Sequence, residues 1–311
     1  MFRINKSFSP RPVFKARAKS TEGQDVLDRL NDYLKRAEKA PVYFLTRFWS
    51  DQKLAITYAE IAAAIQNGYL DAETLEQWRQ DYAVMVVTKL APEWLKAIEA
   101  ANAQYAAAYN FVFDGFSDSV QAWIAEHGSQ FVTRVTLEQE KAINALLSHA
   151  SAGGMNVDEL ARAIRPIIGL TKPQAVANFN YYNHVKTSLL KNNPTMKEAT
   201  AAKRAQEAAI KYAAKQHRYR AQNIAQTELA YAYNQGAHEG IVQMQAEGLL
   251  TKKNKKWSTA MNEMVCEVCG ALEGKEVPMD GYFETGGHRF FIPPAHPGCN
   301  CAVAYVNAEE E

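Results

Sequence analysis

Cysteine is scarce in this sequence and is confined to one end of it. Only four of the 311 residues are cysteine, and they lie in Cys266-Glu-Val-Cys269 and Cys299-Asn-Cys301. In a reducing cytoplasm paired cysteines hold metal more often than they form disulfides, and a disulfide is the alternative that the spacing leaves open. Two pairs that flank about 30 residues of turn-rich sequence suit one tetrahedral Zn²⁺. The C-terminal region is therefore expected to be a small metal-stapled module.

Other features are missing altogether. No stretch approaches the ~20 apolar residues of a membrane-spanning helix, and the basic N-terminus lacks the hydrophobic run of a secretory signal. The sequence has no phosphate-cradling glycine loop, no nucleophile elbow and no His-Glu-Xaa-Xaa-His helix. These absences predict a soluble, non-secreted protein that has no membrane partner and is not an enzyme.

Helix signals dominate residues 21–250. At four places a short oxygen-bearing side chain stands three residues before a carboxylate or amide, as in the capping boxes that begin helices. The pairs are Thr57 with Glu60, Thr136 with Gln139, Asn156 with Glu159, and Thr171 with Gln174, while Gly68, Gly153, Gly154 and Gly169 stand where helices should end. The expected fold is mainly α: a multi-helix body with one long helix, followed by a small C-terminal α+β or β-hairpin module stapled by zinc.

Composition divides the chain into five expected parts. They are a basic flexible arm, an N-terminal helical region, a helical region with the long helix, a cysteine-rich zinc-binding module and an acidic tail. Their bounds are 1–20, 21–130, 131–250, 251–306 and 307–311.

The long helix is expected over residues 195–247, and its two halves differ in chemistry. The first half carries a basic face which, like the basic arm, could follow a phosphate backbone or simply be solvated. These candidate contact residues are Arg3, Lys6, Arg11, Lys15, Arg17, Lys203, Arg204, Lys211, Lys215 and Arg218. The second half carries a ridge of small side chains, which would let another helix approach closely. The ridge consists of Ala221, Ala225, Ala232, Gly236 and Gly240.

The composition changes after residue 250. Residues 251–256 predict a charged linker or hairpin turn, and short strands are expected at 256–260, 275–278 and 301–306. A module of this size has too small an apolar core to fold alone, so the free energy of metal binding should contribute to its folding.

Five side chains compete for four places on the expected zinc ion: Cys266, Cys269, His296, Cys299 and Cys301. Either four thiolates bind and His296 supports them, or His296 replaces one of the downstream cysteines. We favour a Cys₃His site with Cys266 and Cys269 as members, and the spacing does not choose between Cys299 and Cys301. These ligands fill the coordination sphere, which predicts a structural zinc rather than a catalytic one.

Three segments follow one another in a distinctive order. They are Arg220-Ala-Gln-Asn-Ile-Ala-Gln-Thr-Glu228-Leu-Ala-Tyr-Ala-Tyr-Asn234-Gln-Gly236, then Cys266-Xaa-Xaa-Cys269-Xaa-Xaa-Leu272-Xaa-Gly274-Lys275, then Ile292-Pro-Pro-Ala-His296-Pro-Xaa-Cys299-Xaa-Cys301. In this order they closely resemble the phage head morphogenesis proteins of the Mu F-like minor head protein family. The resemblance covers roughly residues 130–306, and Gln226-Thr227-Glu228 departs from the Arg-Thr-Glu usual in the family.

The resemblance implies a minor structural protein of a tailed-phage or prophage head. Such a protein is made in the cytoplasm of the bacterial host and resides in the virion, inside the head near the portal vertex. Its implied partners are the portal protein, capsid or scaffolding proteins and double-stranded DNA, and its implied role is capsid assembly, DNA packaging or DNA delivery. The basic arm and the basic helix face would then touch packaged DNA or an acidic portal surface.

Two other classes of protein compete with this interpretation. One is a zinc-dependent nuclease or DNA-processing enzyme, in which His288 or His296 would activate water. The other is a zinc-ribbon DNA-binding protein, in which residues 251–311 alone would bind DNA with a steep salt dependence.

Overall fold

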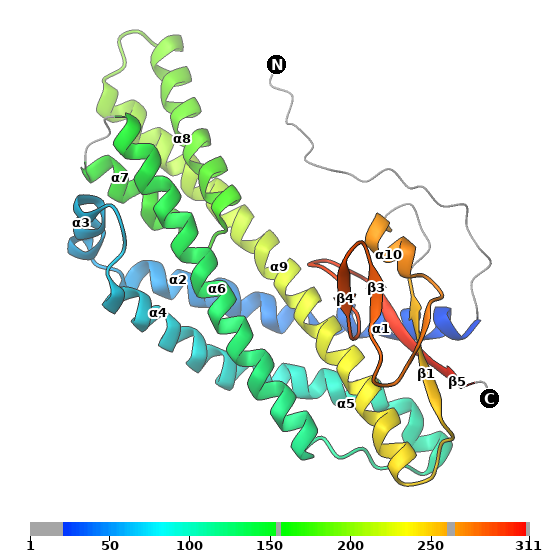
Figure 1. Ribbon diagram of the computed structural model, residues 1–311. Coiled ribbons are helices and arrows are strands. Elements are labelled where there is room, and N and C mark those ends of the chain that lie inside the picture. The colour runs from blue at the N-terminus through cyan, green and yellow to red at the C-terminus, as the bar shows by residue number, and fades with distance from the viewer. Residues whose placement is uncertain (1–20, 154–156, 260–264, 309–311) are drawn as a thin grey trace. The chain divides into compact units, whose positions relative to one another are not determined.

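Helices make up most of the described chain, as the sequence predicts. The computed structural model describes residues 21–153, 157–259 and 265–308 (Figure 1). Its helices are α1 (Thr21–Ala37), α2 (Lys39–Ala55), α3 (Tyr58–Asn67), α4 (Ala72–Met85), the π-helix η1 (Val86–Leu90), α5 (Ala91–Tyr109), α6 (Asp118–Gly153), α7 (Val157–Ile164), the 3₁₀-helix η2 (Arg165–Ile167), α8 (Lys172–Asn192), α9 (Glu198–Ala246) and α10 (Glu267–Leu272). Its strands are β1 (Lys253–Ser258), β2 (Glu276–Pro278), β3 (Phe283–Thr285), β4 (His288–Phe290) and β5 (Ala302–Asn307). The expected long helix is confirmed as α9, whose 49 residues form one continuous element.

The described elements fall into two compact units. Unit 1 gathers the described part of residues 1–39 with residues 93–123 and 223–311, and unit 2 gathers residues 40–92 and 124–222. Helices α6 and α9 contribute residues to both units. The C-terminal strands all belong to unit 1.

Two of the expected capping boxes form. At the start of α3, the Glu60 backbone N–H donates to Thr57 Oγ1 (3.2 Å), and the Thr57 N–H donates to the Glu60 carboxylate (2.6 Å). At the start of α8, Thr171 and Gln174 form the same reciprocal pair. Each box satisfies backbone N–H groups that have no partner inside the helix. Gly68, with φ of +78°, ends α3 in the left-handed conformation expected of it.

The capping box expected at Thr136 is wrong, because Thr136 and Gln139 lie in the middle of α6. Thr136 Oγ1 donates to the carbonyl oxygen of Val132 one turn earlier (2.9 Å), so the hydroxyl is satisfied inside the helix. The buried Gln139 side chain accepts a hydrogen bond from the Tyr82 hydroxyl (2.8 Å). The sequence pattern therefore marks a buried polar contact rather than a helix start. Asn156 and Gly154, which belong to the fourth expected box and its neighbouring helix end, lie outside the described residues.

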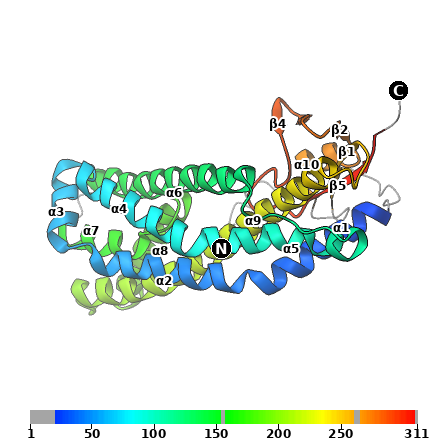
Figure 2. The same cartoon turned by 90° about the horizontal axis from the view of Figure 1, so that it is seen from below.

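The core of unit 2 is organised around Trp49. The indole Nε1–H donates to the Tyr82 hydroxyl (2.9 Å), and the Arg220 guanidinium lies 5.2 Å from the centre of the Trp49 ring. Gly169, with φ of +83°, lies so close to the ring that a Cβ there would be 2.4 Å from it. Arg220 also donates to the Gly169 carbonyl oxygen (2.6 Å), which holds this turn in place. In the same unit α3 and α7 lie side by side (Figure 2).

In unit 1, helix α5 packs against α9 at two glycines of the small-residue ridge. A Cβ added at Gly236 would lie 2.4 Å from Ile98 Cα, and a Cβ at Gly240 would overlap the Asn102 side chain. Asn102 Nδ2 donates to the carbonyl oxygens of Gly236 (2.8 Å) and Ile98 (3.0 Å), so it joins the two helices. The close helix contact therefore requires residues without a side chain at these positions.

The C-terminal strands form a three-stranded antiparallel sheet in the order β2-β1-β5 and a separate β3–β4 hairpin. Helix α1 lies against β5 and β1 (Figure 1). Trp257 of β1 is fully buried between the sheet and the hairpin, where its ring packs edge-on against Phe283 with 5.1 Å between ring centres. The strands expected near 275–278 and 301–306 are confirmed as β2 and β5.

The charged linker expected over residues 251–256 is wrong, because Lys253–Lys256 belongs to β1, the central strand of the sheet. Lys255 is fully buried, and its Nζ donates to the carbonyl oxygens of Gly281 (2.8 Å) and Phe291 (2.9 Å). The ammonium also lies 3.4 Å from the centre of the Phe291 ring, in cation–π contact. These contacts replace the water that a lysine normally keeps, so the strand tolerates the charge.

We expect Gly236→Ala to destabilise the protein, although alanine is the better helix former. The new methyl group would meet the backbone of Ile98, which cannot rotate away, so α5 and α9 must separate. The expected cost is about 1–3 kcal/mol in the free energy of unfolding, measured by chemical denaturation. A gain in stability of about 1 kcal/mol, as helix propensity alone would produce, would contradict the close contact.

Candidate metal centre

The five expected metal ligands converge in unit 1 as two groups of three that share Cys269. Cys266, Cys269 and His296 have donor atoms within 4.8 Å of one another, and so do Cys269, Cys299 and Cys301. His296 Nε2 lies 3.0 Å from Cys266 Sγ and 3.3 Å from Cys269 Sγ, and Cys269 Sγ lies 3.6 Å from Cys299 Sγ. Among the described residues no carboxylate belongs to either group.

Short elements place these side chains. Cys266 is the N-cap of α10, and its Sγ accepts a hydrogen bond from the Cys269 N–H (3.4 Å), so the Cys-Xaa-Xaa-Cys spacing is held by the first turn of the helix. His296 and Cys299 lie in the loop that precedes β5, where Gly298 has φ of +73°. Cys301 directly precedes β5. The sulfurs of Cys269, Cys299 and Cys301 are buried in the apolar core of the module, beside Trp257 and Phe283.

The donor set fits a zinc ion. Bond lengths of about 2.3 Å for Zn–S and 2.0 Å for Zn–N put the donors of a tetrahedral site roughly 3.5–3.8 Å apart, close to the separations seen here. His296 Nδ1 lies 3.0 Å from the Pro297 carbonyl oxygen, and this hydrogen bond leaves Nε2 free to face the sulfurs. None of the four cysteines, all of which are described, forms a disulfide.

The buried thiols differ in how readily they ionise. Hydrogen bonds from the thiols of Cys269 and Cys301 lower the pKa of Cys299, while the hydrogen bond with Cys299 raises the pKa of Cys269. A buried cluster of this kind cannot carry several negative charges on its own. A bound divalent cation would allow the sulfurs to ionise together.

Helix α9 holds the ligand loop and β5 through two polar side chains. Thr227 Oγ1 accepts a hydrogen bond from the Gly298 N–H (3.0 Å). Asn234 Nδ2 donates to the Cys301 carbonyl oxygen (3.3 Å), and Asn234 Oδ1 accepts from the Val303 N–H (3.0 Å). Asn234 is buried, and both the NH₂ group and the carbonyl oxygen of its side-chain amide fix the backbone on either side of Ala302. The motif noted in the sequence is thus an attachment point for the ligands.

His288, the histidine of the nuclease alternative that is not among the five ligands, begins β4, where it is exposed and lies outside both groups. The sequence analysis did not predict the buried environments of three other residues: Lys255, Arg220 and His238. His238 is buried edge-on against Phe291 with 4.9 Å between ring centres, and burial, with the nearby Lys255 charge, lowers its pKa to about 4. It is therefore neutral near pH 7. Burial of these polar residues depends on distant partners, which sequence spacing does not reveal.

The structure places the basic face of α9 in solvent. Lys203, Arg204, Lys211, Lys215 and Arg218 are all exposed, and none of the five forms an ion pair with another described residue. We call these five residues the basic strip. Arg3, Lys6, Arg11, Lys15 and Arg17 of the expected basic arm lie outside the described residues.

The ridge of small residues is buried along its length. Ala221, Ala225 and Ala232 have no exposed surface, and Gly236 and Gly240 face α5 as described above.

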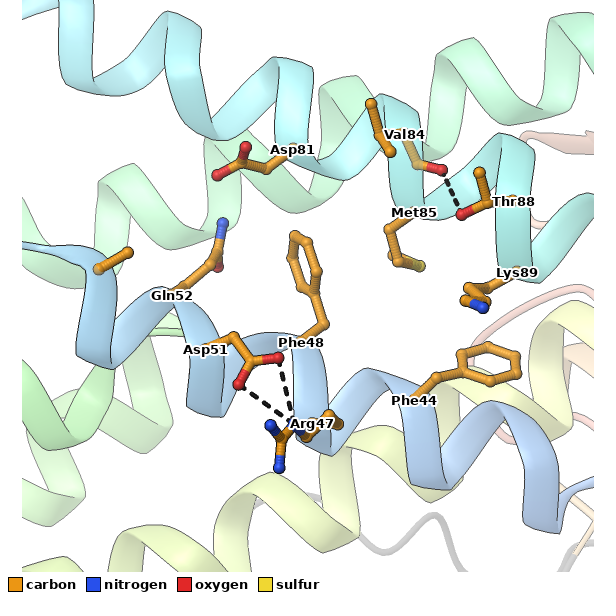
Figure 3. A pocket seen from close by; sticks show the side chains of 11 residues that line it. Phe44, Arg47, Phe48, Asp51, Gln52, Asp81, Val84, Met85, Thr88 and Lys89 are labelled. Carbon is orange, nitrogen blue, oxygen red and sulfur yellow. Dashed lines mark hydrogen bonds and ion pairs between the residues drawn. The ribbon is translucent and has the colours of Figure 1, made fainter.

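One pocket of unit 2 lies between α2 and the α4–η1 segment and has a volume of about 460 Å³. Phe44, Phe48 and Met85 line it, and Arg47 pairs with Asp51 across one turn of α2 (3.2 Å), while Asp81 and Lys89 stand on the opposite wall (Figure 3). Charges of both signs are present in equal number. Charge therefore selects no class of ligand for this pocket.

A family model described as phage Mu protein F like protein matches residues 141–304, more than half of the chain. The chain belongs to this phage Mu F-like family. The match includes α7–α9, both cysteine pairs and His296, so it covers the module and the helix that holds it. No curated protein and no solved structure matches the chain. None of the described helices is both long and apolar enough to cross a membrane.

We expect Asn234→Leu to destabilise the module while preserving the volume of the side chain. The substitution leaves the Val303 N–H and the Cys301 carbonyl oxygen buried without partners, at a cost of about 1–3 kcal/mol in the free energy of unfolding. Asn193→Leu is the matched control, because the Asn193 side chain is exposed and bonds only to the Leu189 carbonyl oxygen. Equal unfolding midpoints for the two variants in a urea titration would contradict the role of Asn234.

Proposed function

We propose that this phage head morphogenesis protein is a minor structural component of the virion, positioned inside the head near the portal vertex. Its partners would be the portal protein and capsid or scaffolding proteins, and its role would lie in capsid assembly and in DNA packaging or delivery. The observation that carries the proposal is the Mu F-like match together with an exposed basic strip that forms no ion pair with any other described residue. Such a strip is suited to an anionic surface, either protein or double-stranded DNA.

The second part of the proposal is that the module holds one structural zinc ion. Cys266, Cys269 and His296 would supply three ligands, because their donors already lie together. Cys299 is the proposed fourth ligand, since its sulfur is 3.6 Å from that of Cys269, close to a tetrahedral edge. The ion would supply folding free energy to the small module and hold the ligand loop against α9.

We further propose that the protein is not an enzyme. A catalytic zinc keeps a position open for water and has a general base beside it. Thiolates and an imidazole fill the proposed site, and no described carboxylate joins either group of ligands. This chemistry disfavours the nuclease alternative.

We expect purified protein to contain zinc in equimolar amount and to lose thermal stability when a strong chelator removes it. Cys269→Ser should abolish zinc retention, because Cys269 belongs to both groups of donors. Cys299→Ser should release zinc and Cys301→Ser should retain it, with elemental analysis as the measurement. His296→Asn should release zinc, whereas the control His288→Asn should not. Fully reduced protein that lacks zinc and has an unchanged melting temperature would refute the structural role.

Charge reversal on the basic strip tests the contact with an anionic partner. We expect Lys211→Glu with Lys215→Glu to weaken binding to a portal oligomer or to duplex DNA roughly tenfold or more at low salt, because attraction becomes repulsion. Binding to each is measured separately, by co-sedimentation for the portal and by gel mobility for DNA. The control is Lys172→Glu with Lys191→Glu, which reverses two exposed lysines of α8. If the parent protein binds neither the portal nor DNA, the contact proposal fails.

A further inference from the structure

A second pocket of unit 2 lies beside the basic strip. It has a volume of about 330 Å³ and is formed by the end of α2, by α3, by α7 and η2, and by the first half of α9. Most of its wall is aliphatic, with Ile61, Pro166 and Ile210 among the lining residues. Ile210 is 48% exposed and Leu54, at the rim, is 79% exposed, so large apolar groups here remain in contact with solvent. The pocket is thus an apolar recess that the chain itself leaves open.

The charged residues of this pocket are all cations. Lys53, Arg162 and Arg165 line it, and no acidic residue does. Arg165 donates to the Ile56 carbonyl oxygen (2.9 Å), which fixes that side chain at the wall. Neither Lys53 nor Arg162 forms an ion pair with any residue that the structure describes. Burial lowers the pKa of Lys53 to about 8, because the ammonium group is poorly solvated.

The pocket and the basic strip share a helix. Ile210 and Ala214 of the pocket alternate along α9 with Lys211 and Lys215 of the strip. Residues adjacent in sequence on a helix are about 100° apart around its axis, so the pocket opens along one border of the strip. A ligand that lies on the strip can therefore also reach the pocket.

We propose that this pocket receives an apolar side chain from an acidic segment of a partner protein, whose carboxylates bind Lys53, Arg162 and Arg165. The proposal rests on the proposed function, because it names the kind of partner that the basic strip would meet. An acidic peptide supplies both features of the site, the aliphatic anchor and the negative charge. A DNA backbone supplies only the charge, and nothing in it would fill an aliphatic recess. The apolar wall therefore favours protein over nucleic acid.

The test uses the full-length protein and two labelled synthetic peptides in a fluorescence anisotropy titration. One peptide has a central leucine flanked by glutamates, and the other has serine in place of that leucine. We expect the leucine peptide to bind about tenfold more tightly, because binding in the pocket removes the apolar leucine side chain from water. A duplex DNA of similar charge serves as the third ligand.

Two pairs of variants locate the binding. Ile210→Glu puts a negative charge in the pocket and should abolish the preference for leucine, whereas Val242→Glu makes the same change at a similarly exposed position of α9 outside the pocket. The double substitution Lys53→Gln with Arg162→Gln should weaken binding of the leucine peptide roughly tenfold. Lys172→Gln with Lys191→Gln is the control, and circular dichroism with thermal melting verifies that every variant is folded.

Each outcome decides between the two proposals. The pocket proposal would be overturned if the two peptides bound equally tightly. It would also be overturned if the Ile210→Glu variant bound the peptides as the parent protein does. The pocket proposal would also fail if the pocket variants lost as much DNA binding as peptide binding, since the pocket would then belong to a nucleic-acid surface. If the strip variants lose binding to the portal or to DNA and the pocket variants keep binding of the leucine peptide, the proposed function stands and the pocket proposal fails. If the pocket variants lose the leucine peptide but the parent protein binds neither the portal nor DNA, the specificity of the pocket stands and the proposed contact of the basic strip fails.

Discussion

The hydrogen bonds of Asn234 are the constraint on which the C-terminal architecture depends. One amide side chain on α9 bonds to the backbone on both sides of Ala302, and Thr227 bonds to Gly298 one loop earlier. A small sheet could not select its position on a long helix through apolar contact alone, because such contact is not directional. These three bonds determine which part of α9 faces the ligand loop. The converging thiols and imidazole then depend on a backbone that is already held in place.

Local signals in the sequence predicted the helices well and the small strands in part. The capping box at Thr57 and the glycine at position 68 act on backbone groups only a few residues away, so the start and the end of α3 could be predicted from the sequence. The same pattern at Thr136 failed, because Gln139 found Tyr82 as a partner far along the chain. A C-terminal β-hairpin module was expected, but the strands β3 and β4 were not located, although the Gly286-Gly287 pair at their turn was an available signal.

The sequence identified the five candidate ligand residues but not how they are arranged in space. Cysteine spacing named all five side chains, because thiol and imidazole chemistry is visible in the residue types themselves. Spacing could not show that Cys269 lies between the two groups, since that depends on how α10 and the loop before β5 meet. The charged stretch before the module was misread for a related reason. Lys255 is buried by Gly281 and Phe291, which only the folded sheet brings near.

The register of β1 with β5 has a mechanical consequence. The pairs run from Lys253 with Asn307 to Ser258 with Ala302, and Cys301 stands immediately beyond the last of them. Tension applied at the C-terminal end of β5 would break these pairs one after another, rather than shearing them all at once. The sheet would open toward the thiols, and the ligand cluster would meet the load only after the sixth pair had parted. Force at that end would therefore dismantle the sheet before it reached the candidate metal ligands.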